Sequence, residues 1–276
     1  MEDSKPIEQQ VAFIGAGNMT EALVSGLLRQ GMAAANRIRV TDIQEDRRAY
    51  FRAAYGVQAA DDNLAAVRQA DWVVLAVKPQ GMQEVFEAIR PAITDRHLVI
   101  SIAAGVPLAR IEAALGEGVR VVRVMPNTPA LVGKGVAAIC PGVHATEADL
   151  SVAERLLGAT GKVVRVEEEQ MDAVTAISGS GPAYVFYLME AMQEAAQRLG
   201  LDEQVADLLI VHTVSGAARL VTETGQSPAE LRERVTSKGG TTAAAISVMQ
   251  EEDVHDHLVT AIMAAYQRAK ELSSGT

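Results

Sequence analysis

An apolar run, Val11–Ile14, leads directly into the closely spaced glycines Gly15 and Gly17. A glycine at the first position permits a tight turn, and one at the second lets the backbone approach a diphosphate. The N–H groups of Asn18 and Met19 would then open a helix and point at phosphate oxygens. This pattern predicts a dinucleotide-binding loop, although such glycines also mark ordinary strand-to-helix turns.

An acidic residue, Asp42, follows a second apolar run, Ile38–Thr41, where a carboxylate could accept a hydrogen bond from the ribose 2′-hydroxyl. A carboxylate repels a 2′-phosphate, so Asp42 favours NADH over NADPH. Arg47 and Arg48 follow closely and could instead attract that phosphate. Asp42 could also serve only as a helix N-cap. Both cofactors therefore remain candidates.

A second glycine pair, Gly239 and Gly240, is followed by Thr241 and Thr242. At the start of a helix, this segment offers free N–H groups and two hydroxyls to one small carboxylate. The alternative is that Thr241 or Thr242 merely caps its own helix.

Short apolar runs alternate with helical patterns in the first half of the chain, as in βαβ units. Their apolar, β-branched composition is typical of strands covered on both faces. The candidate strands are Val11–Ile14, Ile38–Thr41, Trp72–Val77, Leu98–Ile102, Val119–Val124, Gly135–Ile139 and Val163–Val166. We therefore predict an α/β Rossmann-like domain with a parallel sheet over residues 1–168.

No convincing strand follows, and residues 169–276 are expected to form an all-helical dimerisation domain. Start and stop signals place its helices. They are Ser180 with Pro182 and Gly200 for the first helix, Asp202 and Gly225 for the second, Ser227 to Glu230 for the third, and Val254–Leu272 for the last. The long helices are apolar on more than one face, which predicts at least a dimer. The alternative is that they pack entirely on their own α/β domain.

Composition excludes several functional classes. The formal charge of −10 over 276 residues argues against a nucleic-acid partner. One cysteine, Cys140, fits a reducing, cytoplasmic location, and no apolar run reaches the roughly 18 residues of a membrane span. The five histidines lack partners at ligand spacing, so no metal site is expected.

Six segments resemble pyrroline-5-carboxylate reductases, in the same order along nearly the whole chain. They are Phe13–Met19, Ala76–Pro79, Ser101–Gly105, Val124–Ala130, Ser178–Tyr184 and Val235–Thr242. The resemblance implies NAD(P)H-dependent reduction of 1-pyrroline-5-carboxylate to L-proline, and a homodimer or a ring of dimers. It also implies an active site between the cofactor domain and helices of the dimer.

The resemblance carries functional positions onto this sequence. The implied cofactor-binding residues are Ile14, Gly15, Gly17, Asn18, Met19, Asn63, Ala76, Val77, Lys78 and Ala104, to which the acidic position after the second strand adds Asp42. The implied substrate-binding residues are Glu168, Ser237, Gly240, Thr241 and Thr242. Thr242 is expected to hydrogen-bond the imine nitrogen, as an orienting residue with a possible proton-relay role.

Three residues depart from the family pattern. Thr20 replaces a usual alanine and is expected to crowd the first helix against its strand. Lys238 replaces a usual proline, which should loosen its loop and adds a positive charge. Asp42 stands where many members carry a small polar residue suited to NADPH.

Three rival functions remain at this stage. The nearest is a reductase of another cyclic imine or imino acid, which only the pocket volume would distinguish. A non-catalytic dinucleotide-binding redox sensor would not need the Ser237 to Thr242 segment. A β-hydroxyacid dehydrogenase would need a lysine early in its helical domain, and none lies between Lys162 and Lys238.

Overall fold

The computed structural model describes residues 6–274, which divide into two compact units. The first unit runs to residue 180 and also includes the chain from residue 265 onward, whereas the second comprises residues 181–264. The boundary expected at residues 168 and 169 falls inside the first unit.

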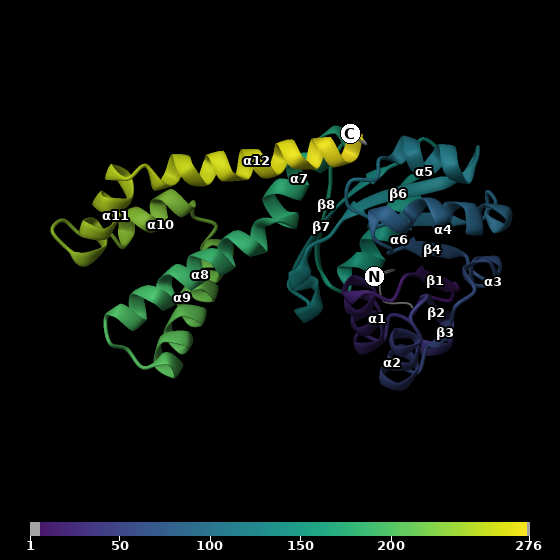
Figure 1. Ribbon diagram of the computed structural model, residues 1–276, viewed down its shortest axis with the longest axis horizontal. Coiled ribbons are helices and arrows are strands. Elements are labelled where there is room, and N and C mark those ends of the chain that lie inside the picture. The colour runs from purple at the N-terminus through teal and green to yellow at the C-terminus, as the bar shows by residue number, and fades with distance from the viewer. Residues whose placement is uncertain (1–5, 275–276) are drawn as a thin grey trace. The chain divides into compact units, whose positions relative to one another are not determined.

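The first unit is built on one eight-stranded sheet (Figure 1). Its strands are β1 (Val11–Ile14), β2 (Ile38–Thr41), β3 (Gln58–Ala60), β4 (Trp72–Leu75), β5 (Leu98–Ser101), β6 (Arg120–Met125), β7 (Gly135–Pro141) and β8 (Gly161–Arg165). The order is β3-β2-β1-β4-β5-β6-β7-β8, so the strand order reverses between β1 and β4. In such sheets, ligands bind beyond the carboxyl ends of the strands at this reversal.

The expected Rossmann-like domain is confirmed, with two differences. Strand β3 was not predicted, because its Gln-Ala-Ala sequence carries no β-branched signal. The sheet is also not wholly parallel, since β7 pairs antiparallel with β6 and β8 then runs parallel to β7. The sequence pattern of a strand does not indicate whether the strand runs parallel or antiparallel to its neighbour.

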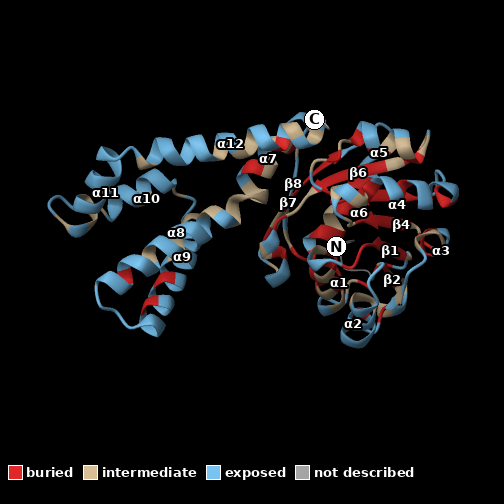
Figure 2. Cartoon of the chain, viewed as in Figure 1, coloured by how far each residue is buried: buried red, intermediate tan, exposed pale blue. Residues whose placement is uncertain are grey.

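Helices cover both faces of the sheet (Figure 2). They are α1 (Asn18–Arg29), α2 (Glu45–Tyr55), α3 (Asn63–Arg68), α4 (Met82–Ile89), α5 (Leu108–Leu115), α6 (Glu147–Gly158) and α7 (Met171–Val174). Successive strand residues alternate between the faces, so Phe13 packs with Leu23 of α1, while Ile14 packs in the cluster that contains Ile111 of α5. This two-sided burial explains why the strands are apolar throughout.

The second unit is helical, as expected. It contains α8 (Gly181–Arg198), α9 (Glu203–Thr224), α10 (Pro228–Arg234), α11 (Thr241–Glu251) and the first part of α12 (Val254–Ser274). Asp202 accepts hydrogen bonds from the N–H groups of Gln204 and Val205, and Ser227 forms a capping box with Glu230. Those two predicted helix starts are confirmed.

Two other predicted helix starts are wrong. Ser180 has helical dihedral angles and follows a π-helical turn, Thr175–Gly179, so it does not begin a helix. Gly240, rather than Thr241 or Thr242, is the N-cap of α11. A glycine N-cap leaves both threonine hydroxyls uncommitted.

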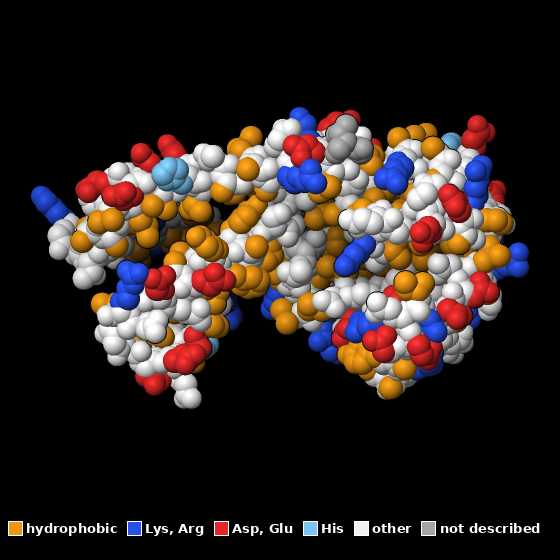
Figure 3. Space-filling model, viewed as in Figure 1, with side chains coloured by type: hydrophobic (Ala, Val, Ile, Leu, Met, Phe, Trp, Pro, Cys, Tyr) orange, Lys and Arg blue, Asp and Glu red, His pale blue; other side chains and the backbone are white. Residues whose placement is uncertain are grey.

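The second unit leaves much apolar surface exposed (Figures 2 and 3). Its buried apolar cluster consists of Ala196, Ala206 and Ile210, whereas Phe186 is 56% and Leu208 is 62% exposed. The prediction that these helices cannot bury their apolar faces within one unit is therefore confirmed. Among residues 6–274, α9 is the one helix long and apolar enough to span a membrane, judged by length and composition alone, and its most apolar window has a mean hydropathy of 1.4. A single helix of this kind is weak evidence for a membrane span.

The buried histidine of the first unit, His97, should make stability depend on pH. Its Nδ1 accepts the Thr94 N–H at 3.0 Å, its Nε2 lies 3.2 Å from the Val67 carbonyl oxygen, and burial lowers its pKa. In the unfolded chain, His97 binds a proton as the pH falls through about 6.5, whereas in the folded protein it does so only at lower pH. The free energy of unfolding therefore decreases as the pH falls below about 6.5, and this decrease ends below the pKa of the folded protein.

We expect the urea midpoint of the wild type to fall more than that of His97→Gln between about pH 7.5 and about pH 5.5. His144→Gln is the matched control, because His144 is exposed. Equal pH dependence in all three proteins would contradict this role for His97.

Candidate active site

The first glycine of the loop is required by its surroundings. Gly15 has a φ of +108°, and a Cβ added there would lie 2.8 Å from the Ala76 carbonyl oxygen. Gly17 is different, because a Cβ added there would meet nothing within 4 Å. Packing within the protein therefore explains Gly15, whereas the space over Gly17 remains open to a ligand that approaches the N-terminus of α1.

Thr20 stabilises this turn instead of straining it. Its side chain is fully buried, and its hydroxyl donates to the Gly15 carbonyl oxygen at 2.6 Å. The expected crowding is thus accommodated by a hydrogen bond that holds the loop against α1. Asn18 and Met19 open α1, where the first N–H groups of a helix have no partner within it.

Asp42 is joined to the same loop. Its Oδ2 accepts the Ala16 N–H at 2.7 Å, and its Oδ1 accepts the Gln44 N–H at 2.9 Å. The carboxylate therefore stands beside the glycine turn at the carboxyl end of β2. Gln44 is the N-cap of α2, so Asp42 is not the cap of that helix.

The two arginines that could attract a 2′-phosphate are already paired. Arg47 forms an ion pair with Glu21 at 2.9 Å and donates to the Ala16 carbonyl oxygen at 2.8 Å. Arg48 pairs with Glu45 at 2.5 Å and donates to the Asp42 carbonyl oxygen at 2.6 Å. A 2′-phosphate would have to compete with these contacts as well as with the Asp42 carboxylate.

The remaining cofactor candidates lie at the same edge of the sheet. Ala76 follows β4 and donates its N–H to the carbonyl oxygen of Ile14, whose side chain is buried. Lys78 and Ala104 are exposed beyond the ends of β4 and β5. The last two, Val77 next to Ala76 and Asn63 at the first position of α3, are partly exposed.

Glu168 has partners that sequence reasoning missed. Its Oε1 accepts the backbone N–H of Leu108 at 2.6 Å and the Nη1 of Arg123 at 3.0 Å. Arg123 lies on β6 with its side chain 6% exposed. A buried arginine inside an apolar strand was the available signal, because such a charge needs a partner.

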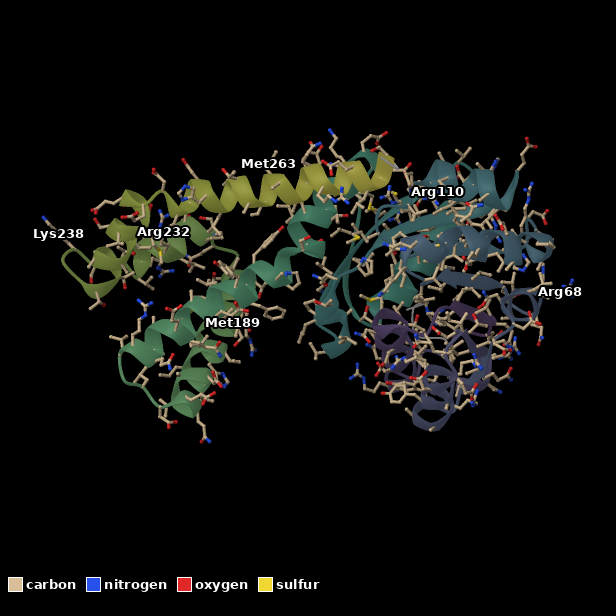
Figure 4. The ribbon with its side chains drawn as sticks, viewed as in Figure 1. Arg68, Arg110, Met189, Arg232, Lys238 and Met263 are labelled. Atoms are coloured by element: carbon tan, nitrogen blue, oxygen red, sulfur yellow. The ribbon has the colours of Figure 1, made fainter. Side chains whose placement is uncertain are left out.

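The candidate carboxylate-binding segment lies in the second unit. The Gly240 N–H donates to the Ser237 carbonyl oxygen at 3.0 Å, closing a turn whose third residue, Gly239, has a φ of +73°. This geometry is typical of a type II turn, which prefers proline at the position of Lys238. Figure 4 shows the Lys238 side chain pointing away from the helices at the tip of this loop.

Thr241 and Thr242 open α11 with no hydrogen bond on either hydroxyl among residues 6–274. A Cβ added at Gly240 would lie 2.6 Å from the Ser237 Oγ, so the backbone passes close to this hydroxyl. The second unit therefore brings Ser237, Gly240, Thr241 and Thr242 together. The cofactor candidates and Glu168 belong to the first unit.

Cys140 is confirmed as a small buried side chain. It is 1% exposed on β7, and burial raises the pKa of its thiol to about 12. A thiol with so high a pKa is a poor nucleophile near neutral pH. Among the described residues, no group of three or more His, Cys, Asp or Glu side chains is arranged to hold a metal ion.

Comparison with known proteins gives a consistent result. The family model described as pyrroline-5-carboxylate reductase dimerisation matches residues 168–272, and the model described as NADP oxidoreductase, coenzyme F420-dependent, matches residues 10–105. The pyrroline-5-carboxylate reductase of Methanosarcina acetivorans is 43% identical over 96% of this chain and 98% of its own length.

Two solved structures are similar along the whole chain. The enzyme of Coxiella burnetii superposes with a TM-score of 0.89 at 42% identity, covering 97% of this chain and 99% of that one. The NADP-bound pyrroline carboxylate reductase of Plasmodium falciparum has a TM-score of 0.89 at 26% identity, covering 98% of this chain and 100% of that one.

Replacing Asp42 should change the choice of dinucleotide. Asp42→Ser removes the carboxylate beside the glycine turn, where the ribose is expected, while keeping a hydrogen-bond acceptor for the Ala16 N–H. We expect the affinity for NADPH relative to NADH to rise about tenfold, which corresponds to ~1.4 kcal/mol, in titrations followed by nucleotide fluorescence. Asp46→Ser, which removes an exposed carboxylate four residues further on, in the first turn of α2, is the control. An unchanged ratio in Asp42→Ser would show that Asp42 does not select the cofactor.

Proposed function

The chain belongs to the pyrroline-5-carboxylate reductase family, and we propose that it reduces 1-pyrroline-5-carboxylate to L-proline through the residues described above. The curated relative at 43% identity and the full-length structural match at 42% identity support this reaction. The observation that carries it in this chain is the Ser237 to Thr242 turn. Its hydroxyls have no hydrogen-bond partner among the described residues, and together with the helix N-terminus they suit one carboxylate.

The residues at the sheet edge fit a nicotinamide dinucleotide. The space over Gly17 would admit a diphosphate at the N-terminus of α1. The Asp42 carboxylate, beside the same turn, would accept a hydrogen bond from a ribose hydroxyl. When bound in its reduced form, the dinucleotide supplies the hydride that reduces the C=N bond. We propose NADH as the favoured cofactor, because Asp42 is anionic and both nearby arginines are paired.

The helical unit would hold the substrate. The N–H groups at the start of α11 and the Ser237 hydroxyl would bind its carboxylate, which fixes the ring in one orientation. Thr242 would hydrogen-bond the imine nitrogen. A threonine hydroxyl is too weak an acid to protonate this nitrogen by itself, so Thr242 acts as an orienting group and can pass on a proton from water.

Glu168 is the carboxylate proposed to lie near the substrate. Its Oε1 is occupied by Leu108 and Arg123, whereas its Oε2 has no hydrogen-bond partner among residues 6–274. The free oxygen would favour the protonated iminium, which is a better hydride acceptor than the neutral imine, by charge complementarity. The reduction of another cyclic imino acid uses the same groups and remains the alternative.

The chain forms a homo-oligomer, as its match to the dimerisation model indicates. We propose that the unit of assembly is a dimer, or a ring of dimers, in which a second copy covers the exposed apolar faces of α8 and α9. The same contact accounts for the apolar composition of α9 without a membrane. We also propose a cytoplasmic location, which the relatives and the single buried cysteine support.

Activity and the role of Thr242 can be tested together by following NADH oxidation at about 340 nm with pyrroline-5-carboxylate. We expect Thr242→Val to lower kcat/KM at least about tenfold, because an oriented hydrogen bond is lost, and Thr242→Ser to stay within about threefold. The control is Thr236→Val in the same loop, since the Thr236 hydroxyl donates to the Arg232 carbonyl oxygen.

No turnover of pyrroline-5-carboxylate by wild-type protein that binds NADH would contradict the proposed reaction. Turnover of a six-membered cyclic imine under the same conditions would then support the alternative. Equal loss of activity in Thr236→Val and Thr242→Val would contradict the specific role of Thr242.

The proposed assembly predicts a charge-sensitive contact on α9. Leu208→Glu places a carboxylate among exposed apolar residues such as Val205 and Val211, where burial by a second copy would be costly. We expect sedimentation velocity to show a smaller species than the wild type. Gln204→Glu adds the same charge at an exposed polar position and should leave the assembly intact. An unchanged assembly in Leu208→Glu would exclude this face from the contact.

A further inference from the structure

Helix α5 is capped from a distant part of the chain. Its N-cap position is Pro107, which offers no side-chain oxygen. The Pro107 carbonyl oxygen accepts the Arg110 N–H at 3.1 Å, but no neighbouring side chain accepts the Leu108 N–H. The Oε1 of Glu168 accepts the Leu108 N–H at 2.6 Å across 60 residues of sequence. A carboxylate at this helix end is also favoured by the helix dipole.

The carboxylate is held in turn by one buried arginine. Arg123 donates to the same Oε1 at 3.0 Å. Its neighbours in the sheet register are Ser101 on β5 and Cys140 on β7, and neither forms a hydrogen bond with it. Glu168 is therefore the sole ion-pair partner of Arg123 among residues 6–274.

The pair controls one end of the turn that joins β5 to α5. At its start, the Ile102 N–H donates to the Leu75 carbonyl oxygen at 3.0 Å. In its middle, Gly105 has a φ of +70° and sits against Leu272, whose Cβ would lie 3.2 Å from an added Cβ. At its far end, the Leu108 N–H is bound by Glu168.

This turn lies on the nicotinamide side of the sheet. A doubly wound sheet binds the two halves of a dinucleotide on either side of the strand reversal. The adenosine half belongs to β1 and β2, where the glycine loop and Asp42 lie, so the nicotinamide half belongs to β4 and β5. Ala104, in the middle of the turn beyond the end of β5, is exposed.

We propose that Arg123 is a positioning residue for the reaction: through Glu168 it fixes the turn between β5 and α5 and thereby orients the nicotinamide half of the cofactor. The inference rests on the proposed function. Arg123 is too deeply buried to touch the cofactor and acts through Glu168 and Leu108. Loss of Arg123 frees the Glu168 carboxylate to leave the helix end, because this side chain is 33% exposed and can be solvated by water.

The two halves of the cofactor provide the test. ADP-ribose carries the adenosine and diphosphate but lacks nicotinamide, so it reports on the glycine loop alone. In calorimetric titrations of the full-length protein, we expect Arg123→Met to weaken NADH binding about tenfold and ADP-ribose binding less than about twofold. Arg123→Lys keeps the charge and should recover part of the NADH affinity.

The same strand offers a matched control. Arg120, also on β6, pairs with the buried Asp149 at 2.7 Å through its Nη1. Arg120→Met removes an ion pair of the same strand without touching the turn, so it should lower the melting temperature but leave the ratio of NADH to ADP-ribose affinity unchanged. A positioning role moves this ratio, whereas general destabilisation does not.

Three outcomes would overturn the proposal. They are equal weakening of both ligands by Arg123→Met, an unchanged NADH affinity in that variant, or the same ratio change in Arg120→Met. Wild-type turnover of pyrroline-5-carboxylate is measured on the same preparation. If the wild type binds NADH but does not turn over this substrate, the proposed function fails, while the two-ligand comparison still decides the role of Arg123.

Discussion

The candidate site depends on the close approach of β1 and β4 at their carboxyl ends. There the Gly15 N–H donates to the Thr41 carbonyl oxygen and the Ala76 N–H donates to that of Ile14, so the ends of β2, β1 and β4 are joined. No side chain fits at Gly15, because the Ala76 carbonyl oxygen occupies the space. The first turn of α1 and the contact between Asp42 and the loop are both consequences of this approach.

Local patterns in the sequence predicted the elements that are determined locally. Strands buried on both faces show as apolar runs, and Asp202 and Ser227 mark helix starts because their own side chains bind the N–H groups a few residues ahead. The failures have non-local causes. The direction of β7 and the continuation of the helix through Ser180 depend on packing that no short window contains.

The residues of the candidate site divide in the same way into those determined by local sequence and those determined by contacts between distant segments. Gly15 and the Gly239 turn were visible because each has a positive φ that favours glycine. Gly17 was visible only through its spacing from Gly15, because a Cβ added there would meet nothing within 4 Å. The contact of Glu168 with Leu108 and Arg123 joins three segments far apart in sequence, and spacing alone could not reveal it. The exposed apolar faces of the helical unit were predictable from composition, because its helices carry more apolar residues than so small a unit can bury.

The last turn of α12 belongs to the unit that begins the chain. Leu272 packs on Gly105, and the Ser273 hydroxyl donates to Asp172 at 2.6 Å. During synthesis, domains generally fold as the chain emerges, starting from the N-terminal side. Here the N-terminal unit cannot complete its own packing until the final helix has left the ribosome. In sequence, the helical unit is therefore inserted between two parts of the first unit. A nascent chain that stalls before α12 is made leaves the turn after β5 exposed to proteases and chaperones.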